Sequence, residues 1–212
     1  CPDDYVIVRY FNAQGNVQAT FTSPALLGHI TSLDAVVNTS NNIVVYVRMD
    51  NINHHLFELN STGALIRNNN IQFTNPVVKY EKLVLSPTGY YLVGNTPRSS
   101  WSDSAHAVIT KLNNNCKVVW NKAYRISNAM SASTNFLDVL YDNNQLLCVG
   151  HYYFNALYAG HAPFRPLICR MDTSGNILQS YAYTVDSSLV GFDEYEMVQV
   201  EKTPKGSYYM IG

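Results

Sequence analysis

Three acidic residues occupy equivalent positions in a recurring strand pattern. Asp34, Asp138 and Glu196 each come one position before an apolar strand, and Lys82 takes the fourth equivalent place. Carboxylate oxygens are the ligands that a hard cation such as Ca²⁺ prefers. If the four strands surround one axis, these side chains form a ring at its mouth that would suit a structural calcium ion; no other cofactor is expected. The alternative is that strand entrances are polar in any case, with Lys82 neutralising part of the ring.

A second group of side chains that could bind a ligand lies between apolar strands. Aromatic residues are concentrated in 150–165 and in the corresponding segment of the preceding repeat, which we expect to be loops on one face of the molecule. Rings exposed on a rigid scaffold offer area for stacking on sugars or for anchoring a protein partner. The alternative is that the longer loop packs its rings on the strands beneath. The candidate ligand-binding residues are Arg98, Trp101, Asp103, His151, Tyr152, Tyr153, Tyr158 and His161.

The sequence contains no pattern typical of catalysis. A nucleophile elbow, a P-loop, a dinucleotide fingerprint, zinc-type Cys and His spacing and an EF-hand loop are all missing. His54 and His55 are the only adjacent histidines, and neighbouring strand residues point to opposite faces, so both could bind one metal ion only with a distorted backbone. We therefore expect a protein without enzymatic activity.

The four cysteines lack the Cys-x-x-Cys spacing of a metal site. Their even number permits two disulfides without requiring any. Cys148 and Cys169 lie in apolar runs, which favours burial as small hydrophobic residues. Cys1 has the position at which bacterial lipoproteins carry a lipid anchor, although a chain boundary accounts for it equally well.

These residues lie on or between the strands of a hairpin that recurs four times. Each copy places a hydrophobic residue, Asn or Asp, two spacers, Gly and one further residue between two strands. Asn or Asp caps its own backbone, and Gly takes the positive φ that closes a short hairpin. Cys116 replaces Gly in the third copy, where we expect Asn114 or Asn115 to supply that conformation. The four copies are 11–17, 59–65, 112–118 and 171–177.

A second hairpin pattern alternates with the first and completes a repeat of four strands. Successive Asn or Asp residues of the first pattern are 48, 53 and 59 residues apart, and a period near 50 that holds four strands is typical of one β-propeller blade. The sequence thus predicts one all-β propeller domain over 1–212, made of four-stranded antiparallel blades. Four blades close a ring, or they form part of a larger propeller. The repeats are about 33–72, 80–124 and 135–183, and a fourth in which 195–212 pairs with 5–21.

The composition excludes two classes of partner. Charged residues make up only 14% of the chain, and the formal net charge is −1. No basic region exists to attract nucleic acid or an anionic membrane, so neither is expected as a partner. No stretch approaches the roughly 18 apolar residues of a membrane-spanning helix, so no transmembrane segment is expected in this chain.

Several stretches resemble a repeat of large bacterial surface proteins. The run 106–124 is similar to a hydrophobic strand, Lys-Leu-Asp-x-x-Gly-Asn, a second strand and Trp-x-Lys-x-Tyr, and 170–178 is the closest single match. The run 202–212 resembles that family's second hairpin, Thr-x-Asp-Gly-Gly-Tyr-x-x-x-Gly. Such repeats occur in propeller-like domains of secreted and cell-surface Bacteroidetes proteins exported with a sorting tail. The resemblance implies the fold and an extracellular or cell-surface location, and it transfers no catalytic residue. The chain departs from the repeat at Cys116 and lacks its Trp in three of the four copies.

These observations favour a non-catalytic extracellular module for binding or scaffolding, as in adhesion. It would recognise a glycan or a surface protein through the face that carries the aromatic loops. A structural subunit or spacer of a surface appendage is the first alternative. A carbohydrate-active enzyme, a glycosidase or a lyase, is the second, because some propellers place carboxylates around the axis; no matched pair of acids stands out.

Overall fold

The computed structural model describes residues 4–26, 28–50, 53–71, 73, 78–96, 105–126, 132–154, 164–183 and 197–212. These residues form sixteen β-strands and no helix. Twelve of the strands make three antiparallel sheets of four strands each, and within each sheet the strands follow one another in chain order. The expectation of an all-β fold with four-stranded antiparallel sheets is thereby confirmed.

The strand bounds follow the two hairpin patterns of the sequence. The first sheet contains β3 (Ile30–Val37), β4 (Ile43–Met49), β5 (His54–Leu59) and β6 (Leu65–Asn70). The second contains β7 (Lys79–Ser86), β8 (Gly89–Asn95), β9 (Ala107–Leu112) and β10 (Val118–Tyr124). The third contains β11 (Ala132–Asp142), β12 (Gln145–Phe154), β13 (Phe164–Asp172) and β14 (Ile177–Ala182). Two further hairpins are β1 (Ile7–Phe11) with β2 (Val17–Thr22), and β15 (Gln199–Lys202) with β16 (Tyr208–Ile211).

Antiparallel order divides each sheet into two hairpins and two ends. We call the first two strands of a sheet its inner hairpin and the last two its outer hairpin. Both hairpin turns lie at one end, the turn end. The link from the second to the third strand, and the link onward to the next sheet, start at the other end, the connection end. β15–β16 is an inner hairpin and β1–β2 an outer hairpin by the same sequence patterns.

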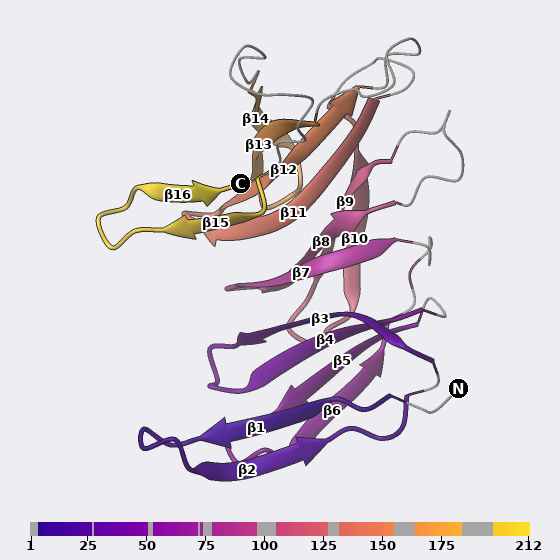
Figure 1. Ribbon diagram of the computed structural model, residues 1–212, viewed down its shortest axis with the longest axis vertical. Helices are drawn as coiled ribbons and strands as arrows, with labels where there is room; N and C mark the ends of the chain where they lie inside the picture. The colour runs from indigo at the N-terminus through magenta and orange to yellow at the C-terminus, as the bar shows by residue number, and fades with distance from the viewer. Residues whose placement is uncertain are drawn as a thin grey trace.

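The sheets stack face to face along the longest dimension of the molecule, with β1–β2 beyond the first sheet and β15–β16 beside the third (Figure 1). The first strands β3, β7, β11 and β15 contact one another in this order. Four hydrophobic clusters fill the successive gaps between β1–β2, the three sheets and β15–β16. Central strands therefore meet apolar neighbours on both faces, which explains uninterrupted apolar runs such as 90–93.

The Asn or Asp turn has one geometry in every outer hairpin. In β1–β2, Asn12 Oδ1 accepts hydrogen bonds from the N–H groups of Gln14 at 3.0 Å and Asn16 at 2.9 Å, while Gly15 takes a φ of 81°. The side chains of Asn60, Asn113 and Asp172 accept the corresponding bonds.

The third copy corrects one expectation from the sequence. Cys116 itself takes the positive φ, at 58°, and neither Asn114 nor Asn115 does. The two bonds to Asn113 place the left-handed residue three positions after it, whatever its type. The Cys116 side chain is buried in the cluster between the first and second sheets, and this packing offsets the backbone strain.

The terminal hairpins also differ from one expectation. We expected 195–212 to pair with 5–21 in one sheet, but β1–β2 and β15–β16 are separate two-stranded sheets, with β1–β2 beyond the first sheet and β15–β16 beside the third (Figure 1). Val6 and Phe21 pack on the first sheet, whereas Val200 and Met210 pack on the third. A shared fourth blade would make both of these contacts, so the difference lies in strand pairing alone, with β1 paired to β2 and β15 to β16.

A pair of glycine substitutions tests how closely the sheets approach at the turns. Gly15 and Gly175 both have positive φ, so an added Cβ costs about 1 kcal/mol at either position. At Gly175 that Cβ would also lie 2.5 Å from the Tyr124 hydroxyl oxygen and 2.8 Å from the Trp120 ring, whereas at Gly15 it meets nothing within 4 Å. In urea denaturation we expect Gly15→Ala to lower the free energy of unfolding by about 1 kcal/mol, and Gly175→Ala by about twice as much or more. Equal losses would contradict contact between the 171–177 turn and the second sheet.

Candidate functional site

Asp34 and Asp138 connect neighbouring inner strands. The Leu83 N–H of β7 donates to Asp34 Oδ2 at 2.8 Å, and the Val200 N–H of β15 donates to Asp138 Oδ2 at 2.9 Å. Lys82 occupies the intermediate position on β7, with its Nζ 3.9 Å from Asp138 Oδ1. Burial raises the pKa of Asp138, while its backbone hydrogen bonds and Lys82 act in the opposite direction. Each carboxylate thus satisfies a backbone N–H of the next sheet, which is a structural task.

The same hydrogen bonds correct the residue predicted for the fourth position of the ring. Asp138 binds the N–H of Val200 as Asp34 binds that of Leu83, and Leu83 follows Lys82 as Val200 follows Gln199. Gln199, and not Glu196, is therefore the structural equivalent of Lys82; sequence alignment placed the start of this strand at an earlier apolar residue. Glu196 lies outside the described residues. Within the described ranges, no three His, Cys, Asp or Glu side chains are grouped to hold a metal ion, and the calcium site stays a prediction.

Two further charged side chains are buried between sheets. Glu58 Oε1 accepts hydrogen bonds from the side-chain amides of Asn38 and Asn42, both at 3.0 Å. Lys111 Nζ donates to Ser86 Oγ at 2.7 Å and lies 4.0 Å from the centroid of the Tyr91 ring. Burial lowers the pKa of Lys111 to about 8. Both charged groups bind partners within the stack, and they do not converge on a common site.

The histidine pair and the cysteines behave as expected. His54 hydrogen-bonds the Tyr46 hydroxyl at 2.7 Å and lies beside Tyr80 of the second sheet, whereas His55 stacks on Phe57. The two imidazoles therefore face different neighbours. Cys1 lies outside the described residues. The three described cysteines are buried free thiols: Cys116, Cys148 and Cys169.

The connection end of the third sheet carries the described part of the predicted binding face. We expected 150–165 to form a loop, but β12 continues to Phe154 and pairs with both β11 and β13. His151 and Tyr152 are therefore strand residues, as is Tyr153, which is placed by its backbone. Aromatic residues favour strands where cross-strand neighbours are present, which explains the extension.

Asn135 joins this group without having been predicted. Its side-chain amide donates to His151 Nε2 at 2.6 Å, and its buried Oδ1 accepts no hydrogen bond from the described residues. Tyr152 is half-buried and packs on the cluster between the second and third sheets. A bulge between Phe136 and Asp138 shifts the β11–β12 register, so counting from the hairpin turn would not have paired Asn135 with His151.

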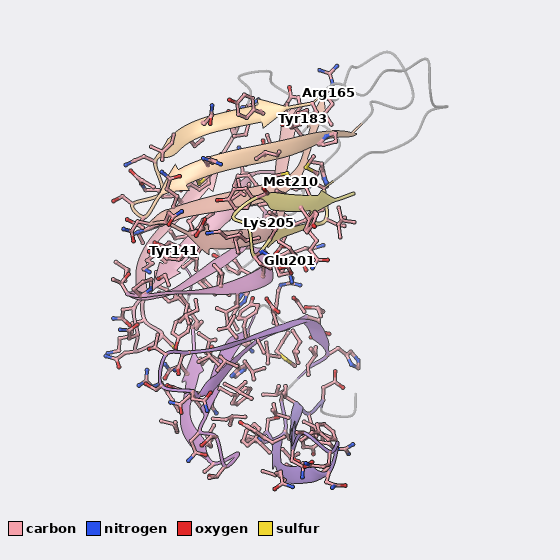
Figure 2. All side chains as sticks on the ribbon, turned by 90° about the vertical axis from the view of Figure 1, so that its left-hand side faces the viewer. Tyr141, Arg165, Tyr183, Glu201, Lys205 and Met210 are labelled. Carbon is pink, nitrogen blue, oxygen red and sulfur yellow. The ribbon has the colours of Figure 1, made fainter. Side chains whose placement is uncertain are left out.

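Hydroxyl groups fix this end of the third sheet to the second. The Ala105 N–H donates to Ser133 Oγ at 3.0 Å, and the Ile126 N–H donates to Thr134 Oγ1 at 3.2 Å. Figure 2 shows Arg165 and Tyr183 at the connection end of the third sheet, with Tyr141 toward the turn end. The group around His151 therefore stands on a rigid support. The remaining candidate residues lie outside the described residues: Arg98, Trp101, Asp103, Tyr158 and His161.

Comparison with known proteins assigns no family. A scan against protein-family models gives no match, and a search of curated proteins finds no significant relative. None of the described segments forms a helix long and apolar enough to cross a membrane.

The buried ammonium group of Lys111 generates a prediction on pH. In the unfolded chain this amine keeps its ordinary pKa of 10.5, whereas in the folded protein its pKa is about 8. Between about pH 8 and pH 10 the unfolded state therefore binds more protons, and this residue makes stability rise with pH. Met has a similar length and no charge, so Lys111→Met should melt at a higher temperature than the parent at pH 7. We expect this difference to shrink between about pH 8 and pH 10 in thermal melts followed by circular dichroism. A difference that does not change with pH would contradict a buried-charge penalty.

Proposed function

We propose that this protein is a non-catalytic binding and scaffold module of the extracellular space or cell surface. It recognises a glycan or another protein through the connection end of its sheets. The observation that carries this proposal is the different use of polar side chains in the two parts of the molecule. Inside the stack, Asp34 and Asp138 accept backbone N–H groups of neighbouring sheets, and Glu58 and Lys111 bind polar side chains of their own sheets. At the connection end, Asn135 keeps an acceptor oxygen that no described residue uses.

We further propose that the stacked sheets are blades of a β-propeller. Four-stranded meanders that recur about every 50 residues are typical of propellers. The consecutive contacts of β3, β7, β11 and β15 support a shared inner side, as strands around an axis would have. The extracellular location rests on the resemblance to repeats of bacterial surface proteins.

A structural role in an assembly is the second candidate. It is favoured by large apolar side chains that stay exposed on the terminal hairpins, among them Phe11 and Tyr209. Single exposed apolar residues are ordinary. In the complete sheets, however, a neighbouring sheet covers the face that is equivalent to the one carrying these residues.

The binding proposal predicts that aromatic residues of the connecting segments are contact residues. Trp101→Ala and Tyr158→Ala should weaken ligand binding by about 2 kcal/mol or more, as expected for interface anchors, and leave the melting temperature unchanged. Glycan arrays and pull-downs from the source surface identify the ligand, and titration calorimetry measures its affinity. Val119→Ala is the control, because Val119 is an exposed apolar residue near the turn end. Loss of stability by roughly 3–5 kcal/mol in the aromatic variants would instead make these rings core residues.

A further inference from the structure

The first and second sheets are joined on their outer side by a specific set of hydrogen bonds. Arg67 Nη1 on β6 donates to the backbone oxygen of Asn114 at 3.1 Å, and Asn69 Nδ2 donates to that of Asn115 at 3.0 Å. Both acceptors belong to the outer-hairpin turn of the second sheet. Side chains of one outer strand therefore hold the next turn by its carbonyl groups.

The second and third sheets repeat this contact. Lys122 Nζ on β10 donates to the backbone oxygen of Ser174 at 2.6 Å, and the Tyr124 hydroxyl donates to that of Gly175 at 2.8 Å. The acceptors again lie in the outer-hairpin turn of the following sheet. The contact thus occurs at both junctions between complete sheets, whereas β1–β2 has Ala19 and Phe21, which have no side-chain donor, at the positions seven and nine residues after Asn12.

The third sheet has hydrogen-bond donors at the same positions of its outer strand. Among the described residues, however, no outer hairpin follows this sheet. Counted from the turn Asn or Asp, the donors at the two junctions lie seven, nine or eleven residues later. The equivalents after Asp172 are Gln179, Tyr181 and Tyr183, all exposed and all able to donate hydrogen bonds. Among the residues that the structure describes, the inner hairpin β15–β16 follows the third sheet, and its residues Glu201, Lys205 and Met210 lie on the near side in Figure 2.

The opposite end of the stack has the complementary features. β1–β2 is an outer hairpin, and β1 pairs with no described strand except β2. Phe11, which precedes the turn residue Asn12, is 59% exposed. The residues that precede the turn in the other three copies are all 0% exposed: Leu59, Leu112 and Met171. Phe11 therefore occupies a position that a preceding sheet covers everywhere else in the molecule.

We propose that the β1–β2 hairpin of a second copy of this chain completes the sheet begun by β15–β16, so that copies associate head to tail. The occupant follows from continuity with an interface that the chain already forms twice. One copy presents an inner hairpin and uncovered donor positions, and the other presents an outer hairpin and a turn of the right type. The association leaves the connection end open, and it does not depend on ligand binding there.

The register of the new strand pair follows from the complete sheets. The residue before the turn Asn or Asp pairs with a residue at the start of the second strand: Leu59 with Ile43, Leu112 with Tyr90 and Met171 with Leu146, and Tyr208 is the equivalent residue of β16. The same rule pairs Tyr208 of one copy with the second copy's Phe11. The 12–16 turn then lies on Gln179 and Tyr181 of the first copy. Strand pairing also removes two open sheet edges, which folded proteins otherwise protect.

This contact joins two different surfaces, so it continues until a ring closes or a filament grows. On the far face of β16, Tyr209 and Ile211 are exposed, and so are Leu33 and Val37 on β3. The same assembly brings these two apolar patches together, because β3 follows β1–β2 in the second copy. Both uncovered faces are then buried in one association.

Sedimentation velocity of the 212-residue protein over a range of concentrations tests the proposal. We expect the average mass to increase with concentration beyond that of a monomer. Phe11→Glu should weaken this self-association by about tenfold or more, because it places a charge where an apolar contact forms. Its melting temperature at low concentration should match that of the parent, since Phe11 is exposed in the single chain. Val119→Glu, also at an exposed apolar position, is the control and should associate as the parent does. A protein that stays monomeric at every concentration overturns the proposal.

Disulfide cross-linking distinguishes association between two copies from pairing of β1 with β16 within one chain. Phe11→Cys and Tyr208→Cys are prepared as separate proteins, each with Cys1→Ser, since the cysteines at 116, 148 and 169 are buried. Mixing the two should produce a disulfide-linked dimer, whereas Val119→Cys mixed with Tyr208→Cys should not. The double variant Phe11→Cys/Tyr208→Cys should also cross-link between chains. A disulfide formed only within single chains at low concentration, with no mixed dimer, would overturn the proposal in favour of a closed ring.

Discussion

A sheet with apolar residues on both faces is stable only where a neighbour covers each face, and this constraint organises the whole molecule. The side chains of β8 and β9 are almost completely buried, because the second sheet has a complete sheet on either side. The terminal hairpins have one covered and one uncovered face, and their exposed apolar residues lie on the uncovered side. Stacked repeats of this kind depend on their neighbours in the same way that solenoid repeats do.

Polar side chains also hold each sheet against its neighbour. Acids on the inner strands accept backbone N–H groups of the next sheet, and donors on the outer strands hold the carbonyl groups of the next turn. Such bonds are directional, so they set the spacing and order of sheets that hydrophobic contact alone would leave free to slide. Under the proposed function, the stack would act as the scaffold, and recognition would fall to the segments at the connection end.

The sequence predicted the four-stranded antiparallel sheets well, because characteristic turn residues mark each repeat. An Asn or Asp that accepts two backbone bonds can be recognised from residue types alone, and it placed the hairpins correctly. Features that depend on tertiary contact were missed. Burial of its side chain offsets the strain of the left-handed conformation at Cys116, and Asn135 meets His151 because a bulge shifts the register. The equivalence of Gln199 with Lys82 became visible only through the bond from Val200 to Asp138.

Amide hydrogen exchange is the most direct measurement of whether coverage by neighbouring sheets carries the stability. It should be recorded at a concentration at which the protein is monomeric, and the protection of each strand converted to a free energy of opening. The account predicts the greatest protection in β8 and β9, and the least in β2 and β16, although all four are hydrogen-bonded strands. Equal protection of β16 and β8 in the monomer would contradict it.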